Sequence, residues 1–587
     1  MRSSDGRQVL LASRHDPEEE ARRWLEATPL QPSATYVVLG MGMGYHVLEI
    51  ERRRGPGTRL VVFEADVRLM RAALERLDFS GLLASGTALL HAGGDLDRLF
   101  EKIEARTLDI AHSPVQLLAH GPSSSLQPEY YERASRWTTA AVQRLSMAVQ
   151  TEYLLAERLF ENRFGNLFRY LVSPTLDELA GRFRGVPAVI VSAGPSLHRS
   201  LDRLAAFEGR AVLIAVSTAL KVLLHEGIRP TFAAIVDFNA ISKRYFDRLD
   251  HDVVRRIPLL CDPRAAPEAI GAYPGPLVFN HDRVSYGLTR RTRGDPQAFE
   301  RTTNVASFAF DVAGLLGCGP VVFVGQDLAY SWHVTHVPGT AIYAQWLPQL
   351  QRFHTLETRE WEEIEAVRGS SLTRVEGQSG GDVYTDCQMS AYRVELERKI
   401  AACGADVINA SEGGARIAGA RAMPLAAVLE AFAGPPRPEV VGFEVPRLEG
   451  AARATRHREA VATIERIRVD LDSTARILEA IRDCNVEMAG AIAEDRPIEV
   501  HVRRAAELEA EAKTFAGVLL AATNLAVTDS IALERERRRM DVEDSPERRL
   551  AYARMNVEYA RCLLAAIDRL RELTGLAALD ARRDRDG

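Results

Sequence analysis

The chain has 587 residues, 46% of them hydrophobic and 26% charged, with a net charge of −6, which is typical of a folded chain of several domains. This acidic balance gives no electrostatic attraction to nucleic acid, and no apolar run is long enough to span a membrane. Residues 1–5 also lack the apolar core of a signal peptide, so we expect a cytoplasmic protein that binds neither nucleic acid nor membrane.

Residues 1–155 are predicted to form a first, Rossmann-like domain. An apolar run at 36–39 leads into Gly40-Met-Gly-Met-Gly44, and a second run ends at Glu64, about twenty residues later. A dinucleotide or S-adenosylmethionine site uses such glycines for close approach and such an acid for ribose hydroxyls. The spacing departs from Gly-x-Gly-x-x-Gly, so a degenerate module for packing or partner binding is an equal alternative.

Residues 156–432 are predicted to form a second α/β domain. Three short apolar runs alternate with two amphipathic segments; the runs are 188–193, 211–216 and 231–236. Such continuous runs are typical of parallel strands buried on both faces, which gives a β-α-β-α-β unit. The carboxyl ends of parallel strands meet at one edge of a sheet, where ligands collect. The residues predicted at this edge are Gly194, Pro195, Ser196, Ser217, Thr218 and Asp237.

The Gly194-Pro195-Ser196 turn is a candidate anion site. Glycine lets a ligand approach the backbone, proline suits a helix start, and a capping Ser196 would leave free N–H groups facing a phosphate. An ordinary strand-to-helix turn with a serine cap has the same residues. The turn alone therefore leaves both interpretations open.

Later parts of this domain add polar residues to the same edge. They are Asn304 at the start of an apolar helix, Gln326 and Asp327 after the strand at 320–325, and Thr385, Glu412 and Gly413 in glycine-rich loops. Such loops can close over a ligand, although any large α/β enzyme has similar loops at its surface.

Two histidines, His333 and His336, follow Asp327 in a loop punctuated by Pro338 and Gly339. Their spacing is not that of a metalloprotease helix and no further ligands accompany them, so we predict no metal site there. An imidazole in this position suits a base that removes a proton from a hydroxyl group. A hydrogen-bonded pair of structural loop histidines is the alternative.

Residues 440–587 are predicted to form a helical bundle. Apolar residues recur there at three- and four-residue spacing, as in Ile464, Ile467 and Leu471 and again in Leu563, Ile567 and Leu570. The bundle would bury one face against itself or against the α/β body, and recognition of an acceptor protein is a second interpretation. The fold class is thus two parallel-sheet domains followed by helices.

Several of these motifs together resemble a known family. The blocks, in order, are Ser192-Ala-Gly-Pro-Ser-Leu197, Asp237 seven residues after Pro230, Val324-Gly-Gln-Asp-Leu-Ala-Tyr330 with His336 and Gly339, Val383-Tyr-Thr385, and Ser411-Glu-Gly-Gly-Ala415. Gly40-Met-Gly-Met-Gly-Tyr45 with Glu64-Ala-Asp66 adds to them. The chain resembles the motility accessory factor (Maf) glycosyltransferases, which modify flagellin with nonulosonic acids. Its central domain is also similar to bacterial sialyltransferases and to 6-hydroxymethylpterin pyrophosphokinases.

The resemblance implies transfer of a nonulosonic acid, such as pseudaminic or legionaminic acid, from a CMP-activated donor to Ser or Thr of flagellin. It implies that His336 is the base, with Asp237 and Asp327 as the other catalytic residues. The residues implied in substrate binding are Gly194, Pro195, Ser196, Ser217, Thr218, Asp237, Asn304, Gln326, Thr385, Glu412 and Gly413. No cofactor is required, although Asp237 and Asp327 could hold Mg²⁺ between them.

Two other functions stay open on the sequence. One is an ATP- and Mg²⁺-dependent pyrophosphokinase acting on a pterin alcohol, which the similarity of the central domain implies. The other is a non-catalytic module that binds flagellin through the helical bundle. The sequence leaves both a monomer and an oligomer open.

Overall fold

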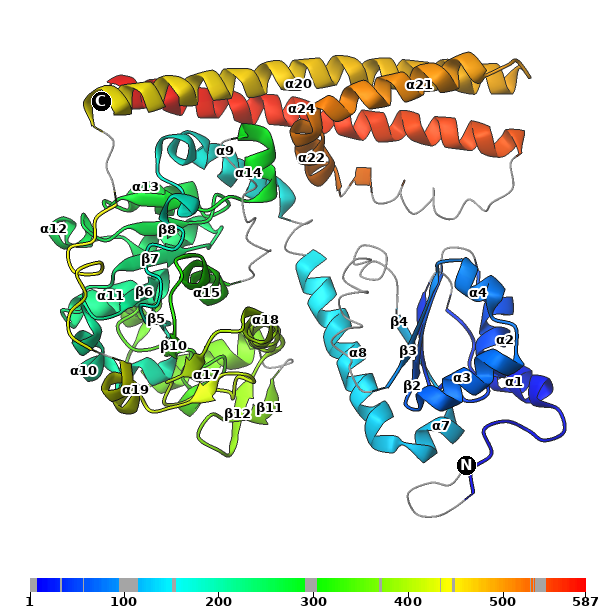
Figure 1. The fold of residues 1–587 in the computed structure, drawn as a ribbon, viewed down its shortest axis with the longest axis horizontal. Coiled ribbons are helices and arrows are strands. Elements are labelled where there is room, and N and C mark those ends of the chain that lie inside the picture. The colour runs from blue at the N-terminus through cyan, green and yellow to red at the C-terminus, as the bar shows by residue number, and fades with distance from the viewer. Residues whose placement is uncertain are drawn as a thin grey trace. The chain divides into compact units, whose positions relative to one another are not determined.

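The structure is a computed structural model, and Figure 1 shows its fold. It describes residues 8–31, 34–55, 58–93, 115–149, 155–290, 304–368, 372–432, 434–445, 449–527, 529–530, 533 and 545–586. The chain divides into two compact units. Unit 1 comprises Met1–Leu155, Asn485–His501 and Val527–Tyr559, and unit 2 comprises Ala156–Cys484, Val502–Ala526 and Ala560–Gly587. The helical C-terminal part therefore contributes to both units.

Unit 1 contains a parallel four-stranded sheet in the order β3-β2-β1-β4. The strands are β1 (Thr35–Leu39), β2 (Arg59–Glu64), β3 (Ala88–Ala92) and β4 (Val115–Ala119). The helices are α1 (Pro17–Glu26), α2 (Tyr45–Arg53), α3 (Val67–Arg76), α4 (Ser80–Ala84), α7 (Gly121–Leu126) and α8 (Pro128–Val149). Alternate residues of β1 enter two separate cores, Tyr36 and Val38 in one and Val37 and Leu39 in the other. Burial on both faces explains why this strand is apolar throughout.

Unit 2 contains an eight-stranded sheet in the order β14-β13-β10-β5-β6-β7-β8-β9, and all its neighbouring strands are parallel. Its strands are β5 (Ala188–Val191), β6 (Val212–Val216), β7 (Phe232–Ile235), β8 (Leu259–Cys261), β9 (Leu277–Phe279), β10 (Val321–Val324), β13 (Val407–Asn409) and β14 (Arg421–Ala422). A separate antiparallel hairpin joins β11 (Thr373–Glu376) and β12 (Asp382–Thr385). The predicted α/β class with two parallel sheets is confirmed.

Helices and 3₁₀ turns connect the strands of unit 2. The α-helices are α9 (Ala156–Val172), α10 (Leu201–Leu204), α11 (Ser217–His225), α12 (His251–Val254), α13 (Pro267–Ala272), α14 (Arg283–Thr289), α15 (Val305–Leu315), α16 (Ala341–Trp346), α17 (Leu356–Arg368), α18 (Cys387–Cys403) and α19 (Leu425–Phe432). The 3₁₀ turns are η2 (Leu176–Leu179), η3 (Pro195–Arg199), η4 (Ala205–Phe207), η5 (Ala240–Tyr245), η6 (Ser331–His333) and η7 (Leu347–Gln349).

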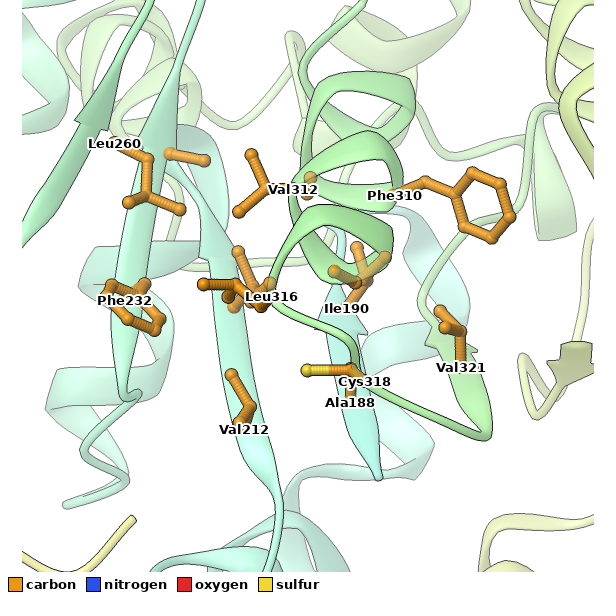
Figure 2. Close-up of a cluster of buried hydrophobic side chains, with 14 of the residues drawn as sticks. Ala188, Ile190, Val212, Phe232, Leu260, Phe310, Val312, Leu316, Cys318 and Val321 are labelled. Atoms are coloured by element: carbon orange, nitrogen blue, oxygen red, sulfur yellow. The ribbon is translucent and has the colours of Figure 1, made fainter. Parts of the chain in front are cut away.

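Helix α15 packs across the middle of the large sheet, as Figure 2 shows. Its Val312 and Leu316 lie in one apolar cluster with Ile190 of β5, Val212 of β6 and Phe232 of β7. All five side chains are buried. Burying a side chain of this size is worth about 1.5–3 kcal/mol, so this cluster fixes the strands whose ends form the site.

The direction of α15 follows from hydrogen bonds at its C-terminal end. The N–H groups of Gly181 and Phe183, shortly before β5, donate to the carbonyls of Leu315 and Leu316 at 2.9 Å. The C-terminal end of α15 therefore lies at the amino ends of the strands. Asn304, which precedes the helix, consequently lies at their carboxyl edge.

The C-terminal part of the chain is helical, as the sequence predicts. It consists of α20 (Gly450–Ala493), α21 (Glu499–Ala512), η9 (Lys513–Phe515), α22 (Ala516–Leu525) and α24 (Pro546–Asp586). Within unit 2, α22 packs on α14 so closely that a Cβ on Gly517 would lie 2.0 Å from the carbonyl oxygen of Gly287. Arg466 of α20 also donates to the carbonyl of Thr289 at 2.8 Å. In the described parts of the chain, no helix combines the length and apolarity that crossing a membrane requires.

Candidate active site

The order of the strands in unit 2 reverses at one place. From β5 the chain continues through β6 to β9 on one side, whereas β10, β13 and β14 lie on the other. Ligands of open α/β sheets bind beyond the carboxyl ends of the strands at such a reversal. The segments that leave β5 and β10 here are Gly194–Ser196 and Gln326–Asp327.

Asp327 and Ser196 are bonded to each other across this reversal. The Ser196 hydroxyl donates to Oδ1 of Asp327 at 2.5 Å, and the Ser196 N–H donates to Oδ2 at 3.1 Å. The hydroxyl of Ser331 donates to the same Oδ2 at 2.6 Å. Burial raises the pKa of Asp327, and these hydrogen bonds oppose the rise. The carboxylate thus holds the turns after β5 and β10 together.

This contact corrects two expectations from the sequence. The hydroxyl and N–H of Ser196 are used by Asp327, so they are not free donors for a phosphate. The turn also begins a five-residue 3₁₀ helix, Pro195–Arg199, and not an α-helix with a free amino end. Both oxygens of Asp327 accept hydrogen bonds, Oδ1 from Ser196 and Oδ2 from Ser331, so the described contacts of this carboxylate are structural ones.

Three glycines make the close approach around Asp327 sterically feasible. A Cβ on Gly194 would lie 2.4 Å from Oδ1 of Asp327, and one on Gly414 would lie 2.3 Å from its Cα. A Cβ on Gly413 would lie 3.0 Å from the ring of Trp332 and 3.2 Å from Cβ of Ser196. Gly194 and Gly413 therefore lie at the predicted edge as close-packing residues.

A second cluster lies where β7 ends. Asp237 accepts a hydrogen bond from the N–H of Asn239 at 2.9 Å. Burial raises the pKa of Asp237, while this N–H and the positive charge of Arg244 oppose the rise. Arg244 also acts on His336: burial of the imidazole, and next the charge of Arg244, lower the pKa of His336 to about 4. The lowered pKa means that the His336 imidazole is neutral at pH 7, and also that it is a weaker base than a free imidazole.

The loop that carries His336 is fixed at several points. The N–H of Val337 donates to the carbonyl of Ala193 at 2.9 Å, which ties the loop to the end of β5. Tyr343 donates to the carbonyl of His336 at 2.9 Å and also to the buried carboxylate of Glu360. Nδ1 of His336 is buried and has no hydrogen-bond partner among the described residues.

His333 lies in a different environment. Its ring stacks on Trp361 with centroids 4.8 Å apart, and its side chain is exposed. The two loop histidines are thus not a mutually bonded structural pair. Of the two histidines, His336 is the one whose pKa is influenced by Arg244, the residue that also influences the pKa of Asp237.

Other predicted residues have defined local partners. Asn304 caps α15, since its Oδ1 accepts the N–H of Ser307 at 2.9 Å. The hydroxyl of Thr385 donates to the carbonyl of Leu328 at 2.8 Å and is buried. These contacts give both residues a structural use at the carboxyl edge.

The remaining predicted residues lie around the same edge. Ser217 and Thr218 begin α11, directly after β6, with Ser217 buried. The backbone N–H of Gln326 donates to the hydroxyl of Ser411 at 2.9 Å. Glu412 lies at the surface, 3.8 Å from Arg203, in an ion pair. No described group of three or more His, Cys, Asp or Glu side chains could hold a metal ion.

Part of this edge belongs to a segment with a known family likeness. Residues 161–332 match the family model described as "6-hydroxymethylpterin diphosphokinase MptE-like". The predicted similarity of the central domain to pterin pyrophosphokinases is confirmed for this segment. It includes Ser196, Asp237, Arg244 and Asp327, whereas His336 follows it.

The chain was also compared with solved structures and with curated proteins. It is similar to the "Structure of MAf glycosyltransferase from Magnetospirillum magneticum AMB-1" at 15% identity and a TM-score of 0.49, covering 98% of this chain and 85% of that chain. No curated protein matched.

Two residues at this edge, Arg244 and Trp332, are not predicted from the sequence. Arg244 lies in η5, seven residues after Asp237, and only its position shortly after a strand-end acid could have marked it. Trp332 has a left-handed backbone (φ 55°) and is 48% exposed, with the guanidinium carbon of Arg199 4.0 Å from its ring centroid. A bulky residue in this region of φ is strained, and the sequence gives no sign of it.

Side chains of unit 1 itself occupy the space beside the glycine-rich turn at residues 40–44. Oε2 of Glu64 accepts the N–H groups of Met41 at 3.0 Å and Gly42 at 3.1 Å. Oε1 of Glu64 accepts the hydroxyl of Tyr131 at 3.0 Å. A Cβ on Gly40 would lie 2.3 Å from Cβ of Ser123, so a side chain packs where a cofactor would approach. This arrangement agrees with a degenerate module and gives no support to a nucleotide site there.

Proposed function

We propose that unit 2 is a glycosyltransferase that moves a nonulosonic acid, such as pseudaminic or legionaminic acid, from a CMP-activated donor to Ser or Thr hydroxyls of flagellin. Such a modification would serve filament assembly and motility. The observation that carries the proposal is the buried, unpaired Nδ1 of His336, on a loop that the N–H of Val337 ties to the carboxyl end of β5. The order of the Maf-like motifs, which contribute His336 and Asp237, supports it.

The proposed step exchanges two C–O bonds at the anomeric carbon. The acceptor hydroxyl oxygen attacks this carbon, and the bond to the phosphate oxygen of CMP breaks, so that CMP leaves with the bonding electrons. The hydroxyl proton passes to the imidazole of His336. A positioned base of this kind contributes roughly 10²- to 10⁴-fold, and a loose, oxocarbenium-like transition state needs the proton removed only late.

The other predicted residues take supporting roles in this proposal. Asp237 would hold a hydroxyl of the ribose or of the sugar, because its carboxylate accepts one hydrogen bond from the N–H of Asn239 and has further lone pairs to offer. Asp327 positions the turns at the ends of β5 and β10 through Ser196 and Ser331. The route requires no cofactor.

The direct test is transfer by the full-length chain. Flagellin and a CMP-nonulosonic acid would be incubated with the protein, and the intact mass of flagellin followed with time. The proposal expects an increase by one nonulosonic acid residue per modified site. Binding of flagellin without any mass change, under conditions in which CMP binds, would favour the non-catalytic module instead.

A pyrophosphokinase is the second candidate, and the family match of residues 161–332 favours it. This reaction would transfer a diphosphate from ATP to a pterin alcohol and would need Mg²⁺. Calorimetry with ATP–Mg²⁺ and with CMP separates the two. If the protein binds ATP–Mg²⁺ and does not bind CMP, the pyrophosphokinase is the better-supported function.

A further inference from the structure

The donor in the proposed reaction is an anion, and the turn expected to bind it is already in use. Ser196 donates its hydroxyl and its N–H to the carboxylate of Asp327. The negative charge of this carboxylate would repel a second anion. An anionic donor in this region therefore needs a positive group elsewhere at the carboxyl edge. Arginine suits this task because its guanidinium presents several N–H donors in a fixed plane.

Arg244 has a free donor and a fixed backbone. Its Nε is buried and has no hydrogen-bond partner in the part of the chain that the structure describes. Its carbonyl accepts the ammonium group of Lys221 at 2.6 Å, which ties η5 to α11. A buried guanidinium nitrogen without a partner is costly, and an anionic oxygen would remove that cost.

The same part of the fold brings Arg244 to the loop of His336. Lys221 of α11 contacts the backbone of Arg244, and its neighbour Val222 faces the loop, where a Cβ on Gly339 would lie 3.7 Å from Cγ2 of Val222. The positive charge of Arg244 lowers the pKa of His336 and opposes the rise in the pKa of Asp237 that burial causes. Among the described residues, the positive charge of Arg244 acts on the titration of Asp237, Tyr245 and His336.

We propose that Arg244 binds an anionic oxygen group of the donor, its phosphate or its sugar carboxylate, and that this pairing strengthens His336 as a base. The inference rests on the proposed function for the identity of the donor. In the free protein the positive charge of Arg244 disfavours a proton on His336. A bound anion offsets this charge, so the imidazole accepts the acceptor's proton more readily when the donor is in place.

The test compares Arg244→Gln with Lys243→Gln, which removes one positive charge from an exposed neighbour on the same turn. Calorimetry on the full-length chain would use CMP, cytidine and the free nonulosonic acid. Arg244→Gln is expected to weaken CMP or the free sugar acid by about tenfold or more, whereas Lys243→Gln changes either less than about twofold. Cytidine should bind both variants equally. Loss of CMP binding assigns the phosphate, and loss of sugar-acid binding assigns the carboxylate.

A second readout follows His336 directly. NMR titration of its imidazole should show a higher pKa in Arg244→Gln than in the unmodified protein, because a neighbouring positive charge is gone, and Arg244→Lys should restore the lower value. Unchanged binding of both CMP and the sugar acid in folded Arg244→Gln would overturn the inference. If the unmodified protein binds ATP and not CMP, the proposed function fails, and the same variants with ATP still test Arg244 as a phosphate ligand.

Discussion

Asp327 accepts both the hydroxyl and the backbone N–H of Ser196, although the two residues are 131 positions apart in the sequence. The contact closes the carboxyl edge at the place where the strand order reverses. Because the carboxylate is 2% exposed, it has little access to water as an alternative partner. Substitutions of Asp327 and Gly194 should therefore act on stability, whereas substitutions of His336 should act on transfer.

Asp327→Asn should lower the free energy of unfolding. The amide keeps one acceptor oxygen but presents an NH₂ group to Ser196 or Ser331, which leaves buried donors unpaired at a cost of about 1–3 kcal/mol. Chemical denaturation followed by circular dichroism would measure it. Glu412→Gln, at the exposed pair with Arg203, is the control and should change stability by less than about 1 kcal/mol. A stable but inactive Asp327→Asn would contradict the structural role and indicate direct participation in the reaction.

Gly194→Ala should be strongly destabilising, because the new Cβ would meet Asp327 and the carbonyl of Gly325, each at 2.4 Å. Gly314→Ala is a matched control in α15, where nothing lies within 4 Å of the new Cβ. Alanine there should raise helix stability by up to about 1 kcal/mol. Thermal unfolding should show a lower melting temperature for Gly194→Ala and an equal or higher one for Gly314→Ala. Equal melting temperatures would show that the turn after β5 can relax.

The stability of unit 1 should fall as the pH falls from about 6.5 towards 4. His46 and His120 stack with centroids 4.2 Å apart, and burial first of all lowers their pKa values to about 4 and about 3. The unfolded chain therefore binds more protons in this window, which favours unfolding. His46 alone should remove about 2 kcal/mol of stability at pH 5 relative to pH 8.

Hydrogen exchange of β1 peptides in the full-length chain would measure this pH effect. His46→Gln keeps a donor for the carbonyl of Gly40 but does not titrate, so it should weaken the pH dependence and leave the part that is due to His120. A profile of the unmodified protein that is flat between pH 8 and pH 5 would show that these histidines do not become charged on unfolding.

Glu64→Ala should destabilise unit 1 and leave the chemistry of unit 2 unchanged. The change removes the acceptor of the N–H groups of Met41 and Gly42 and of the Tyr131 hydroxyl, at a cost of about 1–3 kcal/mol. Hydrogen exchange would report the loosening, and calorimetry would report unchanged CMP binding. Tight binding of S-adenosylmethionine to the unmodified protein, together with loss of transfer in a folded Glu64→Ala variant, would place the reaction in unit 1 instead.

The sequence predicts the strands because their burial leaves a simple pattern. The run 188–191 is apolar throughout since β5 is covered on both faces, and the order of strands and helices follows from such runs and their glycine and proline ends. The same logic predicts that Ser196, Asp237 and Asp327 lie at one edge. The carboxyl ends of parallel strands lie at the same edge of a sheet, so the residues that follow them lie there too.

The sequence does not predict which of those polar residues bind each other. Ser196 was expected to face a ligand and instead faces Asp327, because the glycine at position 194 allows the two turns to touch. The choice between His333 and His336 also depends on backbone angles: His333 has φ 62°, and its ring lies on Trp361. Such long-range and torsional facts have no local pattern in the chain.

The rate of flagellin modification by His336→Ala and His333→Ala would decide whether His336 is the base. Single-turnover transfer from a CMP-nonulosonic acid would be followed by the intact mass of flagellin, with CMP affinity measured in parallel by calorimetry. If His336 is the base, His336→Ala slows transfer by roughly 10²-fold or more at unchanged CMP affinity, while His333→Ala stays within a few-fold of the unmodified protein. Near-normal transfer by His336→Ala, or an equal loss of transfer and of CMP affinity, would contradict His336 as the base.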